Sequence, residues 1–228
     1  MSGQHHKCRF GVIVPWMNRA VESELPYTVP RDLALHWARV RPVVLPDGPD
    51  DDSYISSFVD AIPAAVQDLA PTDIHEVVVA CTSVALVAPD MLSEWGLLGV
   101  TDCILEDLSR HRSRRLLVAS PYSIDLAEKL CDFLEESGFC VTKYVPISST
   151  GEYRDIAIED IRSRILESSD GDHDSVVLSC TALHTQGLRK HLMLAGESRP
   201  LISSVSAISA SLTDRCSACH CFASRRSV

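Results

Sequence analysis

The 228-residue sequence has no long apolar run and no excess of positive charge. No segment approaches the ~18 consecutive apolar residues that a membrane-spanning helix needs. The first residues, MSGQHHKCRF, lack the apolar core of a secretory signal, so we expect a cytoplasmic protein without a membrane partner. The chain carries 21 lysines and arginines against 31 aspartates and glutamates, a net charge of −10. This balance disfavours a nucleic-acid partner.

The nine cysteines are not expected to form a disulfide framework, because this is a medium-sized chain without an export signal. Residues 216–220, CSACH, spell a covalent haem-attachment motif, but such attachment belongs to exported proteins. A structural zinc ion would draw its ligands from two separated pairs, and this segment offers only one. We therefore predict reduced thiols, no metal site, and a flexible tail over residues 213–228.

Short apolar runs alternate with amphipathic stretches along the whole chain. The runs are typical of buried strands and include FGVIVP (10–15), EVVVAC (76–81), RLLVAS (115–120) and SVVLSC (175–180). The stretches between them, such as SYISSFVDAIPAAVQDLA, have helical periodicity. This alternation predicts an α/β protein built from mostly parallel sheets flanked by helices. The loops at the carboxyl ends of parallel strands converge on one edge, where α/β proteins place their chemistry.

Several landmarks recur at nearly the same offset along the chain. Cys81 and Cys180, each at the end of an apolar run and before a hydroxyl residue, are separated by 180 − 81 = 99 positions. The spacing predicts a duplication, with residues 1–112 and 113–212 as two similar α/β lobes related by a pseudo-twofold axis. Such an axis would bring both cysteine-bearing strand ends to an active site in the cleft between the lobes.

Each cysteine is expected to lie beside the start of a helix, because a hydroxyl residue follows it. A helix N-terminus favours negative charge, which can lower a thiol pKa and hold a substrate carboxylate nearby. The amides there, together with the hydroxyls of Thr82, Ser83 and Thr181, would stabilise charge that develops on carboxylate oxygens. Cys81 and Cys180 are therefore candidate acid and base for a small carboxylate substrate.

Three reactions are open to such a pair. A thiolate on one face can remove an α-proton while a thiol on the other face delivers one, which inverts the centre without a cofactor. One thiolate can instead add to a double bond conjugated to a carboxylate, so that rotation and elimination give the other geometric isomer. Decarboxylation of a malonate leaves the same enediolate but needs only one thiol to protonate it. Two cysteines therefore favour racemisation or cis-trans isomerisation.

Four motifs carry a resemblance to a known family: VIVPWMNRAVESELP, ACTSVAL, ASPYS and SCTALHT. With these motifs in this order, the chain resembles the aspartate/glutamate/hydantoin racemase superfamily from about residue 9 to about residue 212. The resemblance is closest to the branch that holds maleate cis-trans isomerases and arylmalonate decarboxylases. It implies two flavodoxin-like lobes and an enzyme with neither a metal nor an organic cofactor.

The resemblance also implies roles for individual residues. It makes Cys81 and Cys180 the paired catalytic thiols. Contacts to the substrate carboxylate and its oxyanion are implied for Asn18, Tyr122, Thr82 and Ser83. In the decarboxylases of this branch a glycine matches Cys81, which groups this chain with the two-cysteine isomerases and racemases.

Two departures from the family pattern make the expected pocket less polar. The segment ISSTGEYRD (147–155) offers no asparagine where maleate isomerases have one, and Val205 replaces an asparagine near the end. A less polar pocket leaves room for a substrate that is larger or less charged than maleate. A malonate-type decarboxylase, a decayed ligand-binding module and a redox role for the C-terminal cysteines remain alternatives. The sequence also leaves room for a homo-oligomer.

Overall fold

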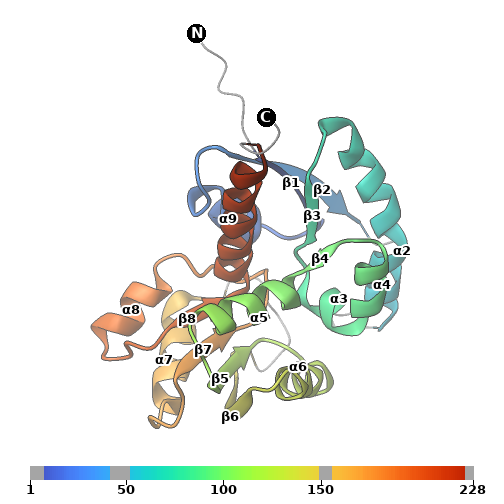
Figure 1. Cartoon of the computed structure of the whole chain (residues 1–228). Coiled ribbons are helices and arrows are strands. Elements are labelled where there is room, and N and C mark those ends of the chain that lie inside the picture. Colours follow the sequence, from blue (N-terminus) through green and yellow to red (C-terminus); the bar gives the residue numbers. More distant parts are fainter. Residues whose placement is uncertain (1–7, 42–51, 149–155, 224–228) are drawn as a thin grey trace.

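Two parallel four-stranded sheets form the framework of the protein (Figure 1). The computed structural model describes residues 8–41, 52–148 and 156–223. The first sheet has the order β2-β1-β3-β4 and contains β1 (Cys8–Pro15), β2 (Leu33–Val40), β3 (Glu76–Val79) and β4 (Leu98–Gly99). The second has the order β6-β5-β7-β8 and contains β5 (Arg115–Ser120), β6 (Cys140–Pro146), β7 (Ser175–Leu178) and β8 (Leu201–Ser203). The matching orders confirm the predicted two-lobe α/β fold.

Helices connect the strands and pack against the sheets. Those of the first half are α1 (Ala20–Glu24), the 3-10 helix η1 (Leu25–Tyr27), α2 (Asp52–Leu69), the 3-10 helix η2 (Ala70–Thr72), α3 (Thr82–Val87), α4 (Pro89–Glu94) and α5 (Val100–Arg110). Those of the second half are α6 (Ile124–Glu136), α7 (Ile158–Ser168), α8 (Leu188–Leu194) and α9 (Ser204–Ala223). Within the described residues, none of these helices has the length and apolarity to cross a membrane.

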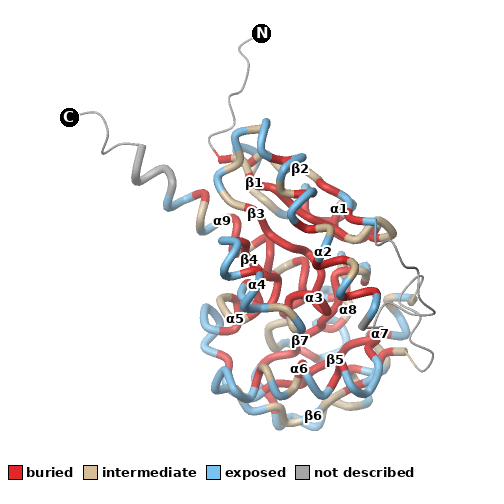
Figure 2. Tube along the Cα trace, turned by 90° about the vertical axis from the view of Figure 1, so that its right-hand side faces the viewer, coloured by how far each residue is buried: buried red, intermediate tan, exposed pale blue. Residues whose placement is uncertain are grey.

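The central strands of both sheets are buried over most of their length. All residues of segments 12–14, 116–119 and 176–178 are fully buried. Consecutive buried residues are typical of parallel strands that are covered on both faces, which explains why these strands stand out in the sequence as continuous apolar runs. Figure 2 shows buried residues along the strands of both lobes, and the buried apolar side chains of the two lobes form one cluster.

The central ladders of the two sheets end at equivalent positions. Between β1 and β3 the last bond is donated by the Ala80 N–H to the Ile13 carbonyl at 2.8 Å. Between β5 and β7 it is donated by the Ser179 N–H to the Ala119 carbonyl at 2.9 Å. The next residue in each lobe is the cysteine singled out above, so both cysteines leave their sheets at the same edge.

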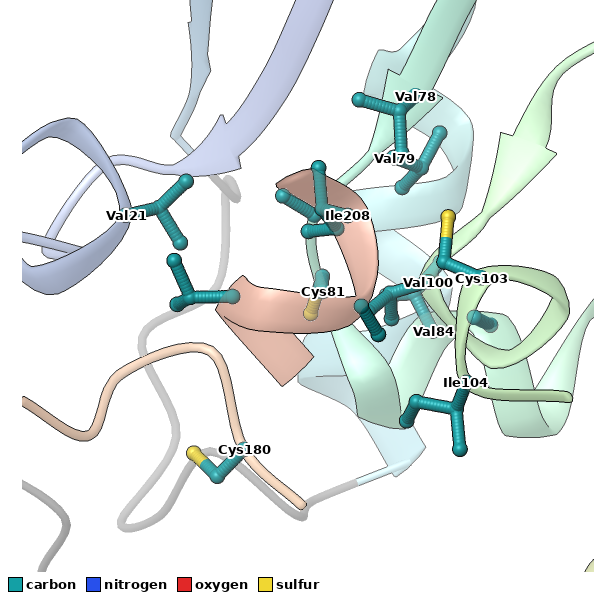
Figure 3. Close-up of a cluster of buried hydrophobic side chains, with 14 of the residues drawn as sticks. Val21, Val78, Val79, Cys81, Val84, Val100, Cys103, Ile104, Cys180 and Ile208 are labelled. Carbon is teal, nitrogen blue, oxygen red and sulfur yellow. The ribbon is translucent and has the colours of Figure 1, made fainter. Parts of the chain in front are cut away.

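The last helix, α9, returns from the second lobe to the first. It follows β8 directly, packs alongside α5 and contacts β1. Figure 3 shows Ile208 of this helix lying between Val21 and Val79 of the first lobe. The three side chains belong to one buried apolar cluster that spans both lobes. Helix α9, which belongs to the second lobe along the chain, therefore joins the two lobes through packing.

The segment predicted as a flexible tail, residues 213–228, is helical as far as residue 223, and its remainder lies outside the described residues. The prediction is wrong for the helical part, where Cys216 is buried. Arg215 also forms ion pairs with two glutamates of the first lobe, at 3.0 and 2.9 Å. These contacts come from residues distant in the sequence, so local periodicity could not reveal them.

Candidate active site

The first thiol lies at the start of α3, as the sequence predicts. Cys81 has an extended backbone and directly precedes Thr82, the first residue of the helix. The thiol is buried, and its sulfur lies 3.4 Å from the Ser83 hydroxyl oxygen. The backbone N–H groups of a first helical turn have no partner within the helix and point toward its N-terminus. A negatively charged sulfur placed there is favoured.

The second thiol differs from the prediction, because no helix begins directly after Cys180. The chain forms a turn there, and α8 starts only at Leu188. Cys180 has a φ of 146°, which non-glycine residues rarely adopt and which costs about 1–3 kcal/mol. The Ala182 N–H donates to the Cys180 sulfur at 3.4 Å. An amide of this turn therefore takes the place that we expected a helix terminus to fill.

Hydrogen bonds across the two lobes bring the cysteine loops together. The Thr181 hydroxyl donates to the Ala80 carbonyl at 2.9 Å, which joins the residue after one cysteine to the residue before the other. Ser204, the first residue of α9, provides a second link. Its hydroxyl oxygen accepts the Cys180 N–H at 3.1 Å and lies 3.4 Å from the Thr82 hydroxyl oxygen. In Figure 3 the sulfur of the first cysteine points toward the segment that carries Cys180.

Asn18 is held within the protein by both ends of its side-chain amide. Its Nδ2 donates to the Thr181 carbonyl at 3.0 Å, and its Oδ1 accepts the Val21 N–H at 3.1 Å. The residue is buried and ties the start of α1 to the second cysteine loop. Its contact with a substrate carboxylate, which the family resemblance implies, stays a prediction.

Two buried tyrosines with raised pKa values lie near the thiols. Tyr122 follows β5, and its hydroxyl lies 3.3 Å from the Ser179 hydroxyl. Burial raises the pKa of Tyr122 well above its usual value, and charge on Cys180 raises it further. Burial also raises the pKa of Tyr54 in α2, with smaller contributions from charge on Cys81 and Cys180. Both phenols therefore stay protonated and can donate hydrogen bonds to an anion.

Sequence reasoning missed Ser204 and Tyr54. Ser204 stands in the segment SVSA, next to Val205, and the departure from the family pattern points only to Val205. Its position directly after β8 is the signal that could have identified it, because this strand ends at the same edge as the cysteine-bearing strands. Tyr54 offers no such signal, because only tertiary packing brings α2 to the thiols.

Among the described residues, neither a cluster of metal-ligating side chains nor the cavity beside α7 includes the two cysteines. Within residues 8–41, 52–148 and 156–223, no cluster of three or more His, Cys, Asp or Glu side chains could hold a metal ion. A cavity of about 580 Å³ beside α7 is lined by Ile147, Ser148, Ile156, Asp160, Ser163, Arg164 and Glu167. None of the predicted site residues lines it. The candidate site is therefore the region around Cys81 and Cys180, whose loops are joined by the bond from Thr181 to Ala80.

A family model described as arylmalonate decarboxylase matches residues 91–218, more than half of the chain. The comparison with curated proteins gives no match.

Several solved structures share the fold over nearly the whole chain. A maleate cis-trans isomerase mutant of Nocardia farcinica with a covalently bound succinylcysteine intermediate is 19% identical, with a TM-score of 0.77 over 90% of this chain and 91% of that chain. The maleate isomerase Iso from Pseudomonas putida S16 is 16% identical, with a TM-score of 0.73 over 91% and 92%. A glycine-to-cysteine mutant of arylmalonate decarboxylase is 21% identical, with a TM-score of 0.69 over 91% and 92%. At these identities the structures show a common fold and do not separate one reaction from another.

Proposed function

Because this chain belongs to the arylmalonate decarboxylase family, we propose that it is a cofactor-independent, two-cysteine isomerase or racemase of a small carboxylate. Cys81 and Cys180 are its acid and base. The bonds from Thr181 to Ala80 and from Cys180 to Ser204 support this assignment, because they tie the two cysteine loops to each other.

In a racemisation, one sulfur begins as a thiolate and the other as a thiol. The thiolate removes the α-proton, and the electrons of the broken C–H bond move into the carboxylate to form an enediolate. The opposite thiol then gives its proton to the other face of the same carbon, so the sulfurs exchange protonation states. Hydrogen bonds from the Tyr122 phenol and from the Thr82 and Ser83 groups would stabilise the enediolate oxygens.

In a cis-trans isomerisation, one thiolate adds to the alkene and the other thiol protonates the adjacent carbon. The new C–S bond leaves a single C–C bond that can rotate. Removal of the same proton by the second sulfur, with departure of the first, restores the double bond in the other geometry. The succinylcysteine intermediate in the Nocardia farcinica isomerase mutant, a protein of the same fold, supports this route as the cis-trans version of the proposal.

Decarboxylation is the second candidate, and the description of the matching family model favours it. Loss of carbon dioxide from a malonate leaves an enediolate, which one thiol protonates. The presence of Cys81, where the decarboxylases of this branch have glycine, argues against it. The two candidates differ in whether Cys81 is essential.

The substrate is proposed to be larger or less charged than maleate. Val205 is buried at the start of α9, next to Ser204, and it offers no hydrogen bond to a second carboxylate. The phenols and hydroxyls near the thiols suit one carboxylate group. An aryl- or alkyl-substituted carboxylate fits this balance of polar and apolar groups.

The test compares Cys81→Ala and Cys180→Ala with the parent protein on a panel of α-substituted carboxylates, maleate and arylmalonates. In heavy water, a racemase introduces deuterium at the α-carbon, whereas a decarboxylase also releases carbon dioxide. We expect each variant to lose at least about 100-fold in turnover of one shared substrate. Full activity of either variant would reject the two-thiol mechanism. Activity lost with Cys180 but kept without Cys81 would establish the decarboxylase instead.

A further inference from the structure

A buried carboxylate of the first lobe binds the loop that carries Cys180. Glu24, the last residue of α1, is only 4% exposed. Its Oε1 accepts the N–H groups of Thr185 at 2.7 Å and of Gln186 at 3.0 Å. Its Oε2 accepts the Thr185 hydroxyl at 2.9 Å. One side chain thus makes three hydrogen bonds to a loop that lies 161 residues further along the chain.

The loop needs outside support because it has no helix of its own before α8. In this partly buried loop, Glu24 supplies acceptors for two backbone N–H groups that have no helical partner. The opposite end of the loop is also held by the first lobe, since Thr181 bonds to Ala80 and Asn18. Cys180, with its φ of 146°, is thus followed by a loop that the first lobe fixes at two places.

Burial of the Glu24 carboxylate costs hydration free energy. An ionised carboxylate that leaves water loses hydration, and hydrogen bonds of this kind only offset that loss. His184 lies near it, with its Nδ1 3.5 Å from Oε1, but the His184 side chain is 52% exposed. The hydrogen bonds of Glu24 therefore add little net stability. Their effect is to hold the loop in one conformation.

We infer that Glu24 is a positioning residue for the proposed two-thiol reaction: from the first lobe, it fixes the Cys180 loop so that the thiol keeps its bond from the Ala182 amide. The catalytic meaning of this inference rests on the proposed function. Its effect on the thiol itself does not, because thiol reactivity can be measured without any substrate.

The experiment measures alkylation of Cys180 and Cys81 by iodoacetamide against pH, peptide by peptide, in the full-length protein. Without Glu24 the loop loosens and the Ala182 amide no longer stabilises the thiolate. We expect Glu24→Ala to raise the apparent pKa of Cys180 by about one unit and to leave that of Cys81 unchanged. Glu24→Gln should restore most of the parental profile, because its amide oxygen can still accept both backbone N–H groups.

The matched control is Glu197→Ala, which removes another buried carboxylate. Glu197 accepts the Ser169 hydroxyl at 2.6 Å and the Arg199 N–H at 3.1 Å, and it precedes β8, at the end of the strand opposite the cysteines. This variant should lower Tm but leave both alkylation profiles unchanged. The same Cys180 shift in this control would mean general loosening and would overturn the inference.

If Glu24→Ala does not fold, Thr185→Val gives the same test in a milder form. It removes the hydroxyl bond to Oε2 and keeps the backbone bond to Oε1, so the Cys180 profile should shift in the same direction by less. An unchanged profile in the folded variant would overturn the inference. If the profiles shift as expected but Cys180→Ala keeps full turnover, the proposed function fails while the positioning role of Glu24 stands.

Discussion

The backbone of Cys180 is unusual for a residue with a side chain. Its φ of 146° lies in a region that glycine adopts at little cost and other residues rarely adopt. Cys81, by contrast, has an ordinary extended backbone with φ −141° and ψ 107°. A strained residue often belongs to a functional site, where the surrounding structure holds it in place. The strain therefore supports a role for the Cys180 thiol beyond packing.

The strained backbone of Cys180 predicts which of two variants at position 180 is the more stable. Cys180→Gly and Cys180→Ala both remove the thiol, but only glycine relieves the backbone, so we expect the glycine variant to be more stable by about 1 kcal/mol. Urea unfolding of the two variants measures the difference. The matched pair Cys81→Gly and Cys81→Ala should show the opposite order, because glycine there only adds flexibility to the unfolded chain. An alanine variant as stable as the glycine variant at position 180 would contradict the prediction.

At the scale of the elements, the strands could be predicted from sequence except the two-residue β4, and so could the start of α3 after Cys81. Both follow from local apolar runs and from a hydroxyl residue placed next to them. The turn after Cys180 could not be predicted, because its bonds go to Ala80 and Glu24, which are 101 and 161 residues away from their partners in the loop. Local patterns favour a helix there, and only the folded pair of lobes supplies the acceptors that stabilise the turn.

A second cluster of polar residues joins two connections at the far end of the second sheet. His173, between α7 and β7, is buried, and its Nε2 accepts an N–H of Arg199 at 3.1 Å. The same ring nitrogen lies 3.3 Å from the Glu197 carboxylate. Burial lowers the pKa of His173, the Arg199 charge lowers it further, and Glu197 opposes both. The neutral imidazole is therefore the form that the folded protein favours.

This cluster predicts a loss of stability in mild acid. The pKa of His173 is lower in the folded than in the unfolded chain, so the unfolded chain binds more protons as the pH falls. The stabilisation is complete above about pH 6.5 and is lost as the pH falls toward the folded-state pKa. His173→Gln should therefore flatten the dependence of the unfolding free energy on pH between about pH 7.5 and about pH 5.5. His191→Gln, a partly exposed histidine of α8, is the control; an equal flattening there, or none in His173→Gln, would contradict the assignment.

At the scale of the whole molecule, α9 connects the candidate site to the far end of the first lobe (Figure 1). Its first residue, Ser204, accepts the Cys180 N–H. In its second half, Arg215 pairs with Glu76 of β3 and Glu106 of α5, at 3.0 and 2.9 Å. The geometry of the site and the stability of the first lobe therefore depend on the same helix.

Truncation tests this dependence. Removal of residues 213–228 eliminates both ion pairs of Arg215 and the buried Cys216, whose backbone carbonyl accepts a bond from the Cys8 thiol at 3.4 Å. Partly exposed ion pairs contribute up to about 1 kcal/mol each, and burial of a small apolar side chain adds a similar amount. We therefore expect the unfolding free energy to fall by about 2 kcal/mol, measured by urea unfolding. The control ends after residue 223 and keeps all of α9, so its unfolding free energy is the reference for the shorter chain.

The same truncation separates two roles of α9. If the helix only adds stability, the alkylation profile of Cys180 in the folded, truncated protein should equal that of the parent. If it also fixes the site, the loss of its C-terminal contacts loosens its first turn, and the bond from the Cys180 N–H to Ser204 weakens. The structure favours the first outcome, because Ile208, one helical turn beyond Ser204, stays in the truncated chain and is fully buried within the core shared by both lobes, which keeps the first turn in place. A parental Cys180 profile and parental stability in the truncated chain would together show that residues 213–223 contribute nothing to either.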